Sequence, residues 1–106
     1  MSTCFFFDSA LRLDQTKELL SQAREKYRDI LRYFWLSEVE EARPPNIEDD
    51  AEYGFDPKCT FLIEWNKERS ELLELIPAIF YEAFGKENIL VRDNNYDVVP
   101  PPKTVD

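Results

Sequence analysis

The sequence predicts an α+β protein, a two-layer sandwich in which two helices lie on a small sheet. In two long segments, apolar residues recur every three or four positions, as on one face of a helix, and short aromatic or alternating runs flank them. A chain of 106 residues with 43% hydrophobic residues is large enough for one hydrophobic core. We therefore expect a single compact domain over residues 1–99, followed by an extended, proline-rich tail at residues 100–106.

The first half of the chain predicts a strand and then a long helix. The aromatic run at residues 3–7 is typical of a buried strand, and Asp14 offers an N-cap for the helix that follows. The apolar stripe of this helix consists of Leu13, Thr16, Leu20, Ala23, Tyr27, Ile30 and Phe34. Its opposite side carries a basic ridge, Arg24, Arg28 and Arg32, interleaved with acidic residues. We expect this ridge to pair within the chain, because a protein with a net charge of −9 is a poor nucleic-acid binder.

The segment after this helix decides between two topologies. If residues 35–39 form a strand, the element order is β-α-β-β-α-β, the ferredoxin-like arrangement of four antiparallel strands under two helices. Without that strand, the chain is a three-stranded β-α-β-α-β layer. The density of aromatic residues at Phe34 and Trp35 favours a strand, so we prefer the first arrangement.

The second half predicts a strand, an interrupted helix and a last strand. Cys59 to Trp65 alternates between two faces, as a strand in a sheet does. We expect Asn66 to cap the next helix, Pro77 to kink or split it, and Gly85 to end it. Residues 88–92 complete the sheet, and residues 93–95 form a turn.

A concentration of acidic residues lies in the middle of the chain. Between Glu38 and Asp56 there are eight acidic residues and one basic residue, Arg43, so this stretch carries most of the net charge of −9. We expect Pro44 and Pro45 to end any regular element and residues 38–58 to form a long connection. A long connection in a compact domain is typically a functional or mobile loop. A charged, solvated loop without a task is the alternative interpretation.

Composition excludes several classes of function. Histidine is absent, which removes Ser-His-Asp and Cys-His catalysis and histidine-based metal sites. Two glycines cannot build a glycine-rich phosphate loop, and the acidic cluster lacks the spacing of a calcium loop. Two cysteines are too few for a disulfide scaffold, and no signal or membrane segment is visible. We expect a cytoplasmic protein that is not an enzyme and holds no cofactor or metal.

The remaining hypothesis is a small acidic binding module, such as an inhibitor, immunity or antitoxin-like protein that captures a basic protein partner. A nuclease or another nucleic-acid-binding protein would suit, including capture by nucleic-acid mimicry. Concentrated charge speeds encounter with such a partner, and aromatic residues prolong the complex. The expected partner-binding residues are Glu48, Asp49, Asp50, Glu52, Tyr53, Phe55 and Asp56. The alternative is a structural or self-associating subunit, for example a homodimer; we expect no direct contact with nucleic acid or membrane.

Overall fold

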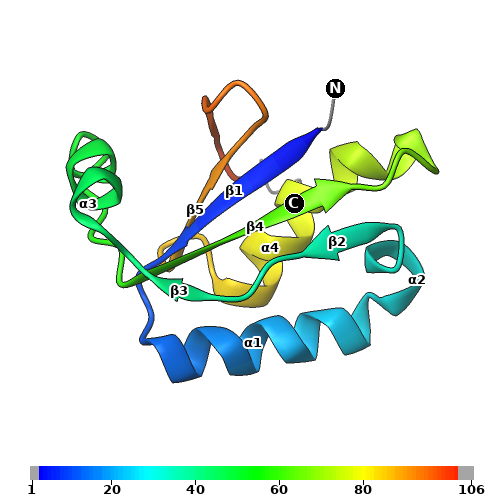
Figure 1. Ribbon diagram of the computed structural model, residues 1–106, viewed down its shortest axis with the longest axis horizontal. Coiled ribbons are helices and arrows are strands. Elements are labelled where there is room, and N and C mark those ends of the chain that lie inside the picture. Colours follow the sequence, from blue (N-terminus) through cyan, green and yellow to red (C-terminus); the bar gives the residue numbers. More distant parts are fainter. Residues whose placement is uncertain (1–2, 103–106) are drawn as a thin grey trace.

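The computed structural model describes residues 3–102 of the chain. Its elements are β1 (Cys4–Ser9), α1 (Leu13–Lys26), α2 (Arg28–Leu31), β2 (Phe34–Leu36), β3 (Glu40–Glu41), α3 (Pro44–Ala51), β4 (Cys59–Trp65), the 3₁₀ helix η1 (Ser70–Leu75), α4 (Ile76–Phe84), β5 (Ile89–Arg92) and β6 (Val98–Val99). Figure 1 shows α1 and α4 against the strands, while α3 projects at one end of the sheet.

The strands form one antiparallel sheet in the order β2-β4-β1-β5-β6, and β3 also pairs with β4. The prediction of an α+β protein with helices on a small antiparallel sheet is confirmed. The uncertain strand exists as β2, although it spans Phe34–Leu36 instead of residues 35–39. The three-stranded alternative is therefore wrong, because β2 pairs with β4 along its whole length.

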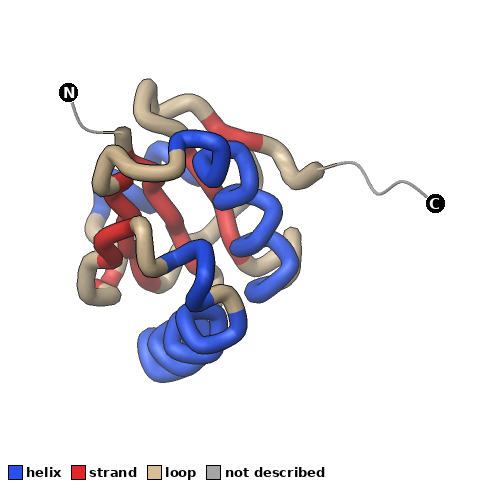
Figure 2. Tube along the Cα trace, turned by 90° about the vertical axis from the view of Figure 1, so that its right-hand side faces the viewer, coloured by secondary structure: helices blue, strands red, loops and turns tan. Residues whose placement is uncertain are grey.

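The hydrophobic core lies between the sheet and the helices. Alternate residues of β1 and β4 point to this side, and six phenylalanine side chains belong to the core. Phe7 stacks on Phe61 with ring centroids 4.9 Å apart, and Phe80 from α4 lies 4.6 Å from Phe7. In Figure 2 most of the helices gather below and to the right of the strands.

Helix α1 follows its predicted stripe, with Thr16, Leu20 and Ala23 buried. Two boundaries differ from the prediction. The residue at the N-cap position is Arg12, while Asp14 lies in the first turn. There its carboxylate interacts favourably with the positive end of the helix dipole. The helix also stops before Phe34: Tyr27 leaves helical geometry, and the short helix α2 ends at Leu31.

The second helical segment is divided, as Pro77 predicted. η1 precedes α4, and Pro77 lies in the first turn of α4, where a missing N–H breaks no hydrogen bond. Asn66 does not cap this segment, because its side chain accepts a hydrogen bond from the Glu68 amide and η1 begins only at Ser70. Gly85 ends α4 with a positive φ of 89°, a conformation that favours glycine.

The acidic connection is more ordered than predicted. Pro44 and Pro45 do not end a regular element; they begin helix α3, because proline fits the first turn, where amides have no partner within the helix. The Asn46 side chain accepts a hydrogen bond from the Arg43 amide at 3.1 Å and closes this end of the helix. At the other end of the chain, Val98 and Val99 form β6, so regular structure extends close to the expected tail. Residues 103–106 of that tail lie outside the described residues.

Candidate functional site

Helix α3 and the turn after it carry most of the predicted binding residues. We call the exposed side chains of Glu48, Asp49, Glu52 and Asp56 the acidic surface. Asp56 pairs with Lys58 at 2.9 Å. The other three carboxylates form no ion pair within residues 3–102. The structure thus gathers these charges on one short helix and its following turn, and leaves most of them free.

Apolar and aromatic side chains accompany the acidic surface. Tyr53 is 52% exposed and Ile47 is 42% exposed, and both belong to the same helix and turn. Phe55 is half-buried. Exposed aromatic residues beside carboxylates are typical of binding surfaces, since an aromatic ring contributes contact area at low entropic cost.

Asp50 differs from its neighbours. Its side chain is fully buried, and Oδ1 accepts a hydrogen bond at 2.9 Å from Nη2 of Arg92, itself 5% exposed. The expectation of a surface carboxylate at Asp50 is therefore wrong: helical periodicity turns this residue inward while Asp49 faces solvent. Asp50 instead anchors α3 to β5, across 42 residues of sequence.

Two tyrosine rings enclose the Arg92 guanidinium. Its central carbon lies 5.4 Å from the centre of the Tyr53 ring and 4.5 Å from that of Tyr96. Arg92 also donates a hydrogen bond from Nη1 to the Tyr96 carbonyl oxygen at 3.1 Å. Cation–π contacts strengthen when the cation is shielded from water. One face of the Tyr53 ring therefore contacts the Arg92 guanidinium, and the side chain remains largely exposed.

A second buried carboxyl, Asp8 at the end of β1, completes this cluster. The pKa of Asp8 is raised to about 8. Burial is the largest cause, and a hydrogen bond with Asp50 and the negative charge of Asp50 act in the same direction. Within residues 3–102, the buried Oδ2 of Asp50 accepts no hydrogen bond from a permanent donor. A protonated Asp8 provides a donor to the Asp50 carboxylate. Arg92 thus pairs with Asp50, and Asp8 beside them keeps its proton at neutral pH.

Sequence reasoning missed Asp8 and Arg92. Each stands at the end of a strongly apolar strand, and β5 is buried along its whole length, including Arg92. A lone charge at the end of a buried strand is a signal, because buried charges need a partner. The partner itself, Asp50, lies in a segment whose helical structure was not predicted.

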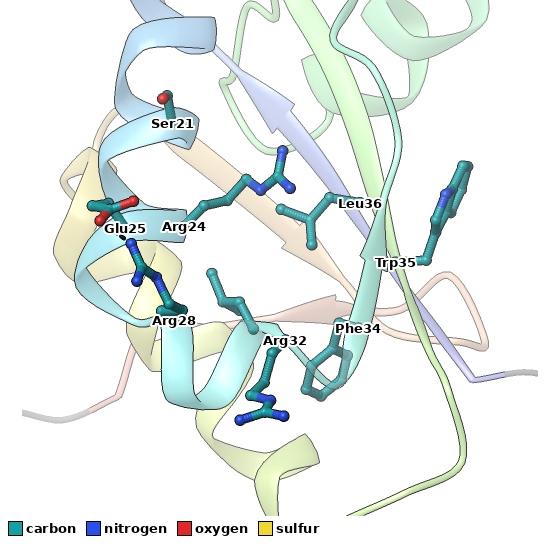
Figure 3. A pocket seen from close by; sticks show the side chains of 9 residues that line it. Ser21, Arg24, Glu25, Arg28, Arg32, Phe34, Trp35 and Leu36 are labelled. Carbon is teal, nitrogen blue, oxygen red and sulfur yellow. Dashed lines mark hydrogen bonds and ion pairs between the residues drawn. The ribbon is translucent and has the colours of Figure 1, made fainter.

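A second charged feature is the arginine cleft, a hollow of about 560 Å³ between the first helices and β2. Figure 3 shows Arg24, Arg28 and Arg32 along one side of it, with Leu36 and Phe34 opposite. Arg28 forms an ion pair with Glu25, which confirms the predicted pairing within the chain for this residue. Arg24 and Arg32 form no ion pair in the described part of the chain.

Other kinds of site find no support in the described residues. Across residues 3–102, no three histidine, cysteine or acidic side chains come close enough together to hold a metal ion. No helix among these residues has the length and apolar character needed to cross a membrane. Burial raises the pKa of the Cys59 thiol, and the thiol donates a hydrogen bond to Thr16 in the core.

Comparison with known proteins identifies the family of this chain. A solved structure, described as a "CdiA-CT/CdiI toxin and immunity complex from Burkholderia pseudomallei", contains a similar chain with a TM-score of 0.83 and 21% sequence identity. The match covers 91% of this chain and 95% of that chain, and at this identity it shows a shared fold. No curated protein matches the sequence. The family model described as "CDI System Immunity Component" matches residues 1–97, which confirms the prediction of an immunity-type binding protein. The chain belongs to the CDI System Immunity Component family.

Proposed function

We propose that this immunity protein neutralises a toxin by binding it through the acidic surface around α3. The related fold comes from a toxin and immunity complex, which supports a toxin as the class of partner. The observation that carries the proposal is the combination, on α3 and the turn after it, of three free carboxylates with exposed Ile47 and Tyr53. Such a surface offers charge for rapid encounter and apolar area for a lasting contact.

The charge of this surface argues for a basic partner surface. Opposite charges steer two proteins together and raise the association rate by a factor on the order of 10 to 1,000 at low salt. The buried anchor between Asp50 and Arg92 holds α3 in place, so the carboxylates meet the partner on a helix that is already positioned. A site positioned before binding loses less conformational entropy in the complex.

Inhibition in this proposal needs no chemistry from the immunity protein. It acts by occupying the toxin, and we infer a non-enzymatic role in the cytoplasm, where cysteines remain reduced. Both cysteines are free, which agrees with that compartment. The family match over residues 1–97 supports a single domain for residues 1–99. For the fold, we propose the ferredoxin-like arrangement for β1, β2, β4 and β5 with α1 and α4, supported by the position of β1 between β4 and β5.

The test is the binding of the purified toxin domain of the same CDI system to a variant with Glu48→Gln, Asp49→Asn and Glu52→Gln. We expect slower association that depends less on salt. The matched control removes the same charge from exposed positions outside the acidic surface, with Asp29→Asn, Glu74→Gln and Glu87→Gln. Equal association rates for the two variants would contradict a role of the acidic surface in capture.

Self-association is a second candidate function, favoured by one observation. The chain carries both an acidic helix and a cleft with two arginines, Arg24 and Arg32, that form no ion pair within residues 3–102. In a homodimer, α3 of one copy would meet this cleft on the other. Sedimentation at low and high salt tests this, and a monomer at low salt would exclude it.

A further inference from the structure

The sheet has a second face, opposite to the helical layer. In the register of β1 and β4, Phe5 pairs with Ile63 and Phe7 with Phe61, and these residues are buried in the core. Phe6 pairs with Leu62, one position along, so both point to the opposite side. Trp35 on β2 pairs with Glu64 and shares that side as well. We call Phe6, Leu62 and Trp35, with the polar residues around them, the open sheet face.

Within residues 3–102, cover over the open sheet face is confined to one end. There, Arg92 is buried beneath α3 and Tyr96, and the Tyr96 ring meets Phe6 edge-on with ring centroids 5.5 Å apart. Toward β2 the cover ends. A hollow of about 380 Å³ remains, lined by Phe6, Trp35, Ser37, Glu38, Glu40, Thr60, Phe61 and Leu62.

Trp35 is the most exposed large apolar side chain among residues 3–102. It is 60% exposed, although it stands on a strand at the edge of the sheet. Figure 3 shows its ring on the side of β2 away from the arginine cleft, while Phe34 and Leu36 face the helices. Strand alternation therefore assigns the Trp35 ring to the open sheet face, although Trp35 also borders the arginine cleft at β2. Tryptophan is the residue type most enriched among interface residues that dominate binding energy.

The charges around this apolar centre are acidic. Glu38 and Glu40 line the hollow and are exposed, and Glu64 lies beside Trp35 on the neighbouring strand. At the covered end, the face adjoins α3 through the contact of Arg92 with Asp50. The open sheet face thus has an apolar centre and an acidic border, and α3 lies at its covered end.

We propose that the open sheet face, centred on Trp35, is the apolar centre of the interface with the toxin. The proposal rests on the proposed function, and it commits to a toxin surface with an apolar projection surrounded by lysine or arginine. Charge complementarity selects this occupant, because Glu38, Glu40 and Glu64 favour basic neighbours. A second copy of this chain is a poor occupant, since face-to-face pairing would bring the same carboxylates together. The acidic surface then contributes mainly to association, and Trp35 mainly to the lifetime of the complex.

The test compares Trp35→Ala with Leu75→Ala for binding to the purified toxin domain. Leu75 is a matched control, because it is 42% exposed but lies on η1 in the helical layer. Loss of a dominant interface residue weakens binding by about 30-fold or more, mostly through faster dissociation. We expect this for Trp35→Ala, and less than a twofold change for Leu75→Ala. Since Trp35 is largely exposed, both variants should keep the melting temperature of the wild type.

A second measurement does not depend on a variant. With 5-fluorotryptophan in the immunity protein, each of the two tryptophans gives one ¹⁹F resonance, which Trp65→Phe assigns. Trp65 is an internal control, because it pairs with Phe34 on the helical side and donates a hydrogen bond to the Glu68 carbonyl oxygen at 2.7 Å. Addition of unlabelled toxin domain should shift the Trp35 resonance and leave that of Trp65 in place.

The outcomes separate this inference from the proposed function. The open sheet face is not the interface if Trp35→Ala binds as tightly as wild type and the Trp35 resonance of the labelled wild-type protein stays unchanged on addition of toxin domain. The proposed function stands in that case if the variant with Glu48→Gln, Asp49→Asn and Glu52→Gln associates more slowly. If wild-type protein does not bind the toxin domain, both fail. Weakened binding together with a shifted Trp35 resonance supports the inference.

Discussion

Arg92 donates a hydrogen bond to Asp50 at 2.9 Å and thereby joins the last long strand of the sheet to the acidic helix. Both side chains are almost fully buried, with 6% and 0% of their side-chain surface exposed. Helix α3 has only eight residues and makes few other links to the sheet, so its position depends on this pair. The binding surface that we propose is thus connected to the scaffold by one internal ion pair.

Removal of one partner from this pair should be strongly destabilising. Arg92→Met leaves the Asp50 carboxylate buried without its cation, which typically costs about 3–5 kcal/mol. The double variant Asp50→Leu/Arg92→Met should regain much of this loss, because no charge then remains buried. Urea denaturation measures both. If the double variant is as unstable as the sum of the two single variants, the pair does not act as a unit.

The stability of the protein should fall as pH rises from the ordinary pKa of Asp8, 3.8, to its folded pKa of about 8. The folded protein holds the Asp8 proton with a pKa of about 8, against an ordinary value of 3.8. Between these values the folded state binds more protons than the unfolded state, so the free energy of unfolding decreases by up to about 1.4 kcal/mol per pH unit. An ionised Asp8 would be repelled by the negative charge of Asp50. The positive charge of Arg92 offsets this repulsion in part.

The matching control is Asp8→Asn, whose amide can still donate to Asp50. Melting temperatures from pH 5 to pH 9 should decline in the wild type and change much less in this variant. Parallel curves for the two proteins would contradict a buried, protonated Asp8.

Charge removal on α3 should separate binding from stability. Glu48→Gln, Asp49→Asn and Glu52→Gln together should leave the free energy of unfolding within about 0.5 kcal/mol per site, as is usual at exposed positions. Association with the toxin domain should slow by about tenfold or more at low salt. Asp50→Asn should do the reverse, with lower stability and a smaller direct effect on association. A stability loss from the exposed set would show that these carboxylates support the fold.

Truncation near the C-terminus should have two different effects. Removal of residues 100–106 should cost little stability, because the last regular element within residues 3–102 ends at Val99. Removal from Val98 onward should cost more, since it deletes β6 and the carbonyl oxygen of Val99 that accepts the Tyr81 hydroxyl hydrogen bond. Thermal melts of the two truncated chains test this order. A large loss on removal of residues 100–106 alone would indicate that the tail contacts the body of the protein.

The part of the fold that depends on local pattern was predictable. The alternation from Cys59 to Trp65 gives β4 its observed bounds, and Gly85 ends α4 where expected. Thr16, Leu20 and Ala23 of the α1 stripe are buried as predicted, but the helix ends at Lys26 instead of continuing toward Phe34, and its N-cap is Arg12 instead of Asp14.

What escaped prediction depends on context or on distant contacts. Pro44 and Pro45 predict the end of any regular element, but proline suits the first turn of a helix equally well, and only the following residues distinguish the two. The burial of Asp50 requires Arg92, 42 positions away, and no local pattern reveals such a pair. Likewise, the exposure of Trp35 follows from which side of the sheet the helices cover.

The alternation of β1 and β4 has a consequence for how immunity proteins of this kind can diversify. Along each strand, one set of residues builds the core with Phe7 and Phe61, and the intervening set, with Phe6 and Leu62, faces outward. With the interface that we propose, substitutions in the outward set would change which toxin is recognised without disturbing the packing that keeps the protein folded. Two relatives would then share nearly the same backbone and bind different toxins, because the same strands would encode fold and recognition at alternate positions.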